Sequence, residues 1–330
     1  MSNNSDNSGG DLTSAKDKYL NSKGEQTTTE ITHKKQNRNI IIIAWIAMLL
    51  ASSLSLILWR EFGFGEPFWW PWLIAISLII LLFLTSIKTN LKPLRQFLII
   101  LVIIFFLGFG GGWQWGLIPL IRDSSTWTIW MASIPWALSA ILTHILRLLP
   151  AIVLLSYLLI IGRKRQDFFL VKGKIKALVE PSKLLGMKEP EPWTKIGSIF
   201  AAIFSIGTFT FLIFTSPTTF ETFINTIPLI PVAVLIAAIN AFNEEFTLRA
   251  APISELWTKI GKQQALLITT IYFGLGHYYG IPNGILGVAL SAFLGWFLGK
   301  SLLETKGFLW AWFIHFLPDI IIFTFYAMSV

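Results

Sequence analysis

The chain has 330 residues, of which 54% are hydrophobic and only 13% are charged, and its formal net charge is +8. With a mean hydropathy of +0.65, this composition excludes an ordinary soluble globular domain and indicates a multi-pass membrane protein. The positive charge does not indicate nucleic-acid binding, because the basic residues lie almost entirely between apolar segments. The absence of cysteine excludes a disulfide framework, a thiolate nucleophile and a thiolate zinc site.

The first 38 residues are polar, and the rest of the chain is dominated by apolar segments. Residues 1–38 are rich in Ser, Asn, Asp and Lys, so we expect a disordered cytoplasmic tail. Nine apolar segments follow, and most are long enough to cross about 30 Å of hydrocarbon as helices. They lie at about 40–59, 68–86, 94–118, 129–161, 196–214, 228–254, 264–279, 283–299 and 308–328. The sequence therefore predicts an all-α polytopic membrane protein with about nine transmembrane helices.

The basic residues predict how these helices are oriented. Most of the 26 Lys and Arg residues precede the first segment or follow the second, fourth, sixth and eighth. Because basic residues concentrate in cytoplasmic connections, the N-terminus is expected in the cytoplasm and the C-terminus outside. The expected location is an integral, multi-pass position in a membrane, with the cell membrane preferred.

A basic, proline-containing connection at residues 162–194 divides the chain. We expect a four-span membrane region at 39–161, a basic cytoplasmic loop at 162–194 and a catalytic helical bundle at 195–330. The loop is interpreted as a linker that touches anionic lipid headgroups, with substrate docking as the alternative.

Two adjacent carboxylates and a guanidinium end the sixth apolar segment, where burying a charge costs roughly 2.5–3.5 kcal/mol. These side chains belong to Glu244, Glu245 and Arg249. On a helix, Glu245 and Arg249 share a face and can form an ion pair, whereas Glu244 points about 100° away. This pattern is typical of a buried general base at Glu244 beside a structural acid.

Further costly side chains of the last spans are His277, His315 and Asp319. If the sixth and seventh helices form a hairpin at Gly261, Glu244 and His277 lie level, roughly 15–20 Å below the cytoplasmic face. His315 lies roughly 12 Å below the same face, and Asp319 shares its side of the helix. These residues are therefore expected to converge on one site that opens toward the cytoplasm. His144 and Arg147, in the fourth segment, are not assigned to it and are interpreted as structural.

Small residues recur at three- and four-residue steps along the eighth segment. They are Gly284, Gly287, Ser291, Gly295 and Gly299. A stripe of this kind allows helix backbones to approach closely, so it predicts packing against neighbouring helices.

Three sequence motifs carry a family resemblance. EExxxR spans Glu244 to Arg249, FxxxH spans Phe273 to His277, and HxxxD spans His315 to Asp319, in this order on separate apolar segments. The sequence thereby resembles the CPBP family of intramembrane proteases, named for CAAX proteases and bacteriocin-processing enzymes, and in particular the type II CAAX prenyl endopeptidases. The resemblance covers about residues 190–330.

The resemblance implies an intramembrane endopeptidase in which Glu244 and His277 activate a water molecule. It further implies that His315 and Asp319 stabilise the oxyanion. The ion pair of Glu245 and Arg249 would support the site. Many relatives have Asn at position 319, and an ionised Asp cannot donate a hydrogen bond to an oxyanion. Asp319 would therefore have to be protonated, orient His315 or bind a metal.

No cofactor is favoured, and zinc bound by Glu244, His277 and His315 is the alternative, because Glu and His suit zinc. The HExxH motif of zinc proteases is absent from the sequence. The expected partners are a membrane-associated peptide or protein substrate and the lipid bilayer, with no nucleic acid. Two other functions remain open, namely a non-catalytic immunity or scaffold protein of the same family and a proton-coupled transporter, since buried acids and histidines also form proton relays.

Overall fold

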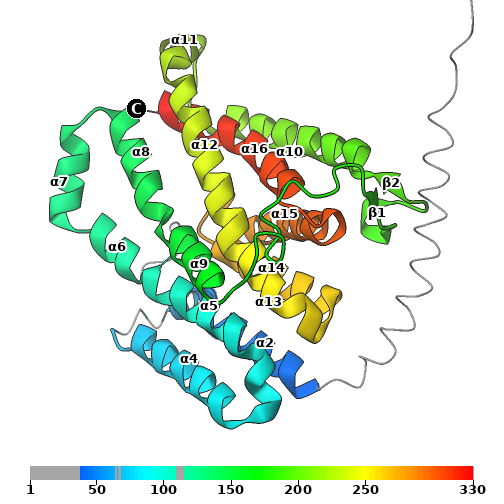
Figure 1. Cartoon of the computed structure of the whole chain (residues 1–330). Helices are drawn as coiled ribbons and strands as arrows, with labels where there is room; N and C mark the ends of the chain where they lie inside the picture. Colours follow the sequence, from blue (N-terminus) through cyan, green and yellow to red (C-terminus); the bar gives the residue numbers. More distant parts are fainter. Residues whose placement is uncertain (1–37, 64, 66–67, 109–114, 330) are drawn as a thin grey trace, which may run out of the picture.

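The structure is a computed structural model that describes residues 38–63, 65, 68–108 and 115–329. Its regular elements are almost entirely helical (Figure 1), as the sequence predicts. The N-terminal elements are α2 (Arg38–Ala51), α3 (Leu54–Glu61), α4 (Trp70–Ile87), η1 (Thr89–Leu94), α5 (Arg95–Leu107), α6 (Leu117–Arg122), α7 (Ser125–Ser133), α8 (Trp136–Arg147) and α9 (Leu149–Ile160). The expected N-terminal tail lies, apart from Arg38, outside the described residues.

The remaining elements begin with the connection after α9. They are β1 (Leu178–Val179), η2 (Lys183–Leu185), β2 (Glu191–Pro192), α10 (Trp193–Thr215), α11 (Phe220–Thr226), η3 (Ile227–Leu229), α12 (Ile230–Glu245), η4 (Phe246–Ala250), α13 (Ala251–Ile260), α14 (Lys262–Gly276), α15 (Gly284–Thr305) and α16 (Leu309–Met328). The two strands pair antiparallel, with Leu178 opposite Pro192.

The helices confirm an integral, multi-pass membrane protein. Seven helical segments of the described chain are long and apolar enough to cross a membrane, or eight if the bent pair α2 and α3 is one span. The count is lower than the nine expected because α14 has 15 residues, fewer than the roughly 20 that a crossing helix needs. The expected turn at Gly261 is present between α13 and α14, where φ is +88°. The orientation across the membrane stays a prediction.

The helix α12 occupies the centre of the C-terminal half and packs against α16 on one side and α8 on the other (Figure 1). Helices α14 and α15 pack along each other, and α10 packs along α16. Three helices that carry the predicted site residues are therefore joined, α12 to α16 by direct packing and α14 to α16 through α15.

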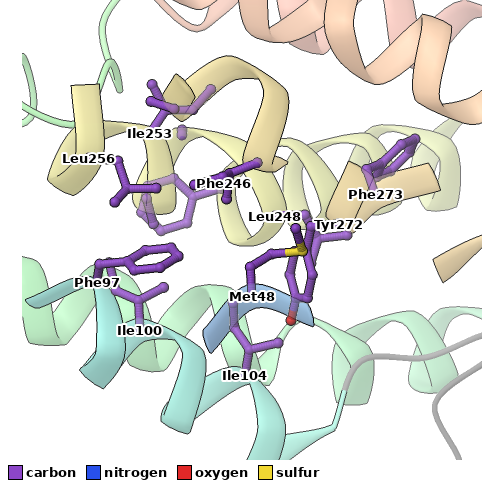
Figure 2. Close-up of a cluster of buried hydrophobic side chains, with 14 of the residues drawn as sticks. Met48, Phe97, Ile100, Ile104, Phe246, Leu248, Ile253, Leu256, Tyr272 and Phe273 are labelled. Carbon is purple, nitrogen blue, oxygen red and sulfur yellow. The ribbon is translucent and has the colours of Figure 1, made fainter. Parts of the chain in front are cut away.

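A buried apolar cluster joins the N-terminal helices to this half of the chain (Figure 2). Phe97 and Ile100 of α5 lie near Phe246 of η4 and Leu256 of α13, and all four side chains are almost fully buried. Lipid tails are as apolar as these side chains, so van der Waals packing, rather than transfer from water, stabilises such contacts in a membrane. The expected boundaries near residues 161 and 194 stay a prediction, but one apolar core extends across them.

The small residues of α15 face α14 at two of the predicted positions and the connection that precedes α15 at a third. A Cβ atom at Gly295 would lie 3.1 Å from Phe273 Cδ1, and one at Gly299 would lie 2.6 Å from Leu266 Cδ1. At Gly287 it would lie 2.0 Å from the carbonyl oxygen of Pro282. The predicted close packing is thus confirmed for these glycines.

The basic loop, expected to be a linker, is hydrogen-bonded to the turn between α15 and α16. Lys174 N–H donates to Thr305 O (2.7 Å), and Phe308 N–H donates to Val171 O (2.8 Å). These backbone bonds fix the middle of the loop against the start of α16, the helix that carries two of the predicted site residues.

A carboxylate near the end of α15 holds the second part of the same loop. Glu304 accepts hydrogen bonds from Trp193 Nε1 (2.9 Å) and from Glu180 N–H (3.2 Å). It also forms an ion pair with Lys300 one turn earlier on its own helix. The loop is therefore a packed part of the C-terminal half.

Candidate active site

The acidic pair lies where the central helix changes its winding. Glu244 and Glu245 are the last residues of α12, and the π-helical turn η4 follows without a break. Such turns insert an extra residue into a helix and often mark functional sites. The predicted ion pair between Glu245 and Arg249 forms across this turn, with both side chains fully buried.

Glu245 connects the ion pair to the second histidine. It lies 2.6 Å from Nδ1 of His315. Because a carboxylate only accepts hydrogen bonds, Nδ1 of His315 carries the proton and donates it. This hydrogen bond fixes the tautomer and the orientation of the ring. Nε2 of His315 then faces Glu244 Oε2 at 3.7 Å and Asp319 Oδ1 at 3.6 Å.

The Glu244 carboxylate, which is 7% exposed, is surrounded by donors and cations. Asn240 Nδ2 donates to Glu244 Oε1 (3.2 Å), and Arg147 Nη2 lies 3.5 Å from the same oxygen. His315 Nε2 lies near its other oxygen. Glu244 thus lies outside the Glu245–Arg249 ion pair, as the sequence predicts, but it is not the free acid that this pattern suggests, because Arg147 and Asn240 are its partners.

Asp319 lies on the same face of α16 as His315, although Pro318 lies inside this helix. Its Oδ2 accepts a hydrogen bond from Asn240 Nδ2 (2.9 Å). Asp319 is therefore brought to the same cluster as Glu244 and His315, and α12 and α16 are linked at this level.

His277 caps the end of α14 and has one ring nitrogen engaged. Its Nδ1–H donates to the carbonyl oxygen of Phe273 (2.8 Å), which leaves Nε2 available to the site. Its ring packs against that of Phe273, which also packs against the ring of His315. The three helices thus bring together all the residues predicted for the site.

Phe273, the first residue of the FxxxH motif, packs against three of these groups. The guanidinium of Arg249 lies 3.7 Å from the centre of its ring, within the range of a cation–π interaction. The ring also lies 4.3 Å from that of His277 and 6.1 Å from that of His315. Phe273 thereby fixes the position of the EExxxR motif, through Arg249, relative to the HxxxD motif, through His315.

Two residues that contact Glu244, Asn240 and Arg147, were not predicted from the sequence to belong to the site. Asn240 lies one helical turn before Glu244, so its spacing was a usable signal. Arg147 was not assigned to the site and was interpreted as structural, but it reaches Glu244 from α8 and therefore lies at the cluster. Its sequence separation of 97 residues gave no indication of the contact.

The described residues provide no set of ligands for the zinc ion considered as the alternative. Among the described residues, no group of three or more His, Cys, Asp and Glu side chains has the geometry to hold a metal ion. Glu244, His277 and His315 therefore do not fit a zinc site as they are arranged here, and no step through a metal follows.

These features define an all-α, multi-pass membrane protein whose C-terminal helices bury a cluster of carboxylates and histidines. Residues 225–321 match the family model of type II CAAX prenyl endopeptidase Rce1-like proteins. This region of the chain is therefore CAAX-protease-like, as its motifs predict, and the family indicates a membrane peptidase. The match includes every predicted site residue but not Arg147. Comparisons with curated proteins and with solved structures give no significant match.

Proposed function

We propose that the protein is an intramembrane endopeptidase that hydrolyses a peptide bond in a membrane-associated protein or peptide. The observation that carries this proposal is the convergence of Glu244 and His315 on one buried site, with Nε2 of His315 facing Glu244 and its Nδ1 held by Glu245. His277, with a free Nε2, completes the set from a third helix.

In the proposed reaction, Glu244 is the general base. Aided by His277, it removes a proton from a water molecule whose oxygen attacks the carbonyl carbon of the scissile bond. The oxyanion that forms is stabilised by His315 in its protonated form. Collapse of the intermediate breaks the C–N bond, and the proton taken up by Glu244 passes to the leaving amine.

Three further residues, Glu245, Arg249 and Asp319, support the reaction without touching the substrate. Glu245 accepts from Nδ1 of His315, so it orients the ring and stabilises its positive charge. Arg249 balances the charge of Glu245, which would otherwise be buried unpaired. Asp319 lies beside Nε2 and interacts favourably with the positive charge that His315 carries in the proposed reaction. In this proposal Asp319 therefore acts on His315 and not directly on the oxyanion.

The test is a comparison of membrane proteomes from cells that express the wild type, Glu244→Gln or Glu221→Gln. Glu221 is an exposed carboxylate of α11, so its variant controls for loss of a charge. We expect one or more uncleaved precursors to accumulate with Glu244→Gln alone, at equal abundance of the three proteins. Their sequences would identify the substrate among lipid-modified peptides, bacteriocin leaders and membrane-anchored regulators.

Two outcomes would contradict the proposal. If Glu244→Gln membranes contain the same cleaved products as the wild type, Glu244 is not a catalytic base. If proteoliposomes of the wild type carry a proton-coupled flux that Glu244→Gln abolishes, and no precursor accumulates, the protein is a carrier.

A further inference from the structure

Two buried carboxylates share one amide donor at the centre of the site. Nδ2 of Asn240 donates to Glu244 Oε1 (3.2 Å) and to Asp319 Oδ2 (2.9 Å). All three side chains are at least nine-tenths buried. Like charges in a buried site repel each other, and a group that donates a hydrogen bond to both carboxylates offsets this repulsion.

A second group that lies near the same two carboxylates is the ring of His315. Its Nε2 is 3.7 Å from Glu244 and 3.6 Å from Asp319, and both distances are too long for direct hydrogen bonds. Asn240 therefore makes the direct bonds, while His315 keeps Nε2 for the chemistry proposed above.

The orientation of the Asn240 side chain follows from its acceptors. The amide nitrogen has two hydrogens, and each has a carboxylate oxygen within reach. Within the described residues, Oδ1 of Asn240 has no hydrogen-bond partner. The amide is thus arranged entirely around the two carboxylates.

We propose that Asn240 is a positioning residue for the hydrolytic reaction, which fixes the Glu244 carboxylate for proton transfer and holds Asp319 against His315. The inference rests on the proposed function, because it needs Glu244 to be the base. Asn240 is also the residue that links α12 to α16 beside Glu244, through its hydrogen bond to Asp319.

The test compares Asn240→Asp, Asp319→Asn and the double variant Asn240→Asp/Asp319→Asn. Asn240→Asp keeps the size of the side chain and replaces the donor by an acceptor, so neither carboxylate is held. Asp319→Asn keeps the donor of Asn240 for Glu244. The double variant restores an amide–carboxylate pair between positions 240 and 319 but leaves Glu244 beside a carboxylate.

The assay is cleavage, by purified protein in detergent, of the precursor that accumulates with Glu244→Gln. We expect Asn240→Asp to lower kcat about 10- to 100-fold at nearly unchanged KM, the factor that loss of a hydrogen bond to a charged group gives. We expect the double variant to have a higher Tm than Asn240→Asp, because it restores the pair between positions 240 and 319. Its kcat should nevertheless be well below that of Asp319→Asn alone. Comparison with the single variant cancels any contribution that Asp319 makes itself.

Thr324→Ala is the matched control, because Thr324 is on α16 and donates only to a backbone carbonyl of its own helix, that of Ile320. A wild-type kcat in Asn240→Asp, with Glu244→Gln inactive, would overturn this inference and leave the proposed function standing. A double variant as fast as Asp319→Asn would also overturn it, because the bond between positions 240 and 319 would then be the whole role. Cleavage by Glu244→Gln would overturn the proposed function itself.

Discussion

Nη2 of Arg147 lies 3.5 Å from Oε1 of Glu244, although the two residues are 97 positions apart. A hydrogen bond from Asn243 Nδ2 to the carbonyl oxygen of Arg147 (2.8 Å) holds the end of α8 against α12 beside this contact. The N-terminal half of the chain, outside the region that matches the family, thus supplies a cation to the proposed general base.

We predict that Arg147→Met lowers the cleavage rate about tenfold at neutral pH without lowering protein abundance. Arg147 contacts the carboxylate that accepts the proton in the proposed reaction, so without this contact the carboxylate of Glu244 is less firmly positioned. The measurement is the cleavage rate of purified protein, together with its abundance in the membrane.

Arg122→Met is the control for this prediction, since Arg122 pairs with the adjacent Asp123 at an exposed position. A wild-type cleavage rate in Arg147→Met would show that the reaction does not need the contact between Arg147 and Glu244.

Arg249→Met is expected to destabilise the fold itself. It leaves Glu245 as a buried charge without its main partner, and breaking a buried pair costs roughly 3–5 kcal/mol. We expect a lower Tm in detergent and reduced abundance, and partial recovery in Glu245→Gln/Arg249→Met. Lys195→Met, which removes an exposed i,i+4 pair with Glu191, should change stability by less than about 1 kcal/mol. An abundant Arg249→Met protein with the wild-type Tm would refute this account of the ion pair.

Gly295→Leu is expected to lower the Tm and, with it, the activity. Its side chain would enter the space between α15 and the residues Phe273 and Arg249, and overpacking of this kind costs roughly 1–3 kcal/mol. Gly207→Leu on α10 is the matched control, since a Cβ atom there meets nothing within 4 Å. Equal melting temperatures of the two variants would show that α15 does not need the small residue.

Glu304→Gln is expected to loosen the basic loop. The neutral amide loses the ion pair with Lys300 and weakens the acceptor for Trp193. Limited trypsin digestion of the detergent-solubilised protein should then cleave faster after the exposed residues Lys172, Lys174 and Lys176. Glu189→Gln, an exposed position of the same loop, should digest like the wild type, and an unchanged digestion rate in Glu304→Gln would show that the loop is held by its backbone bonds alone.

Local spacing was sufficient to predict the parts of the site that lie on one helix. Glu245 and Arg249, and likewise His315 and Asp319, are four residues apart, and the geometry of a helix brings such residues to one face. The hairpin at Gly261 was also readable, because the polar stretch around it cannot remain in hydrocarbon. What the spacing did not show is that Glu245 holds His315, since that contact depends on how α12 and α16 pack.

The sequence by itself determined that this is an all-α membrane protein. Backbone N–H and C=O groups in lipid must be hydrogen-bonded within the protein, and a long apolar segment satisfies them within itself as a helix. It also identified the costly acids and histidines and the family motifs that contain them. Only the tertiary structure decided which neighbours these groups have. The packing of α12 against α16 makes Asn240 a donor to both Glu244 and Asp319. The packing of α8 against α12 places the cation of Arg147 beside Glu244. Contacts between distant helices depend on how side chains fit across the whole bundle, and no local pattern encodes that fit.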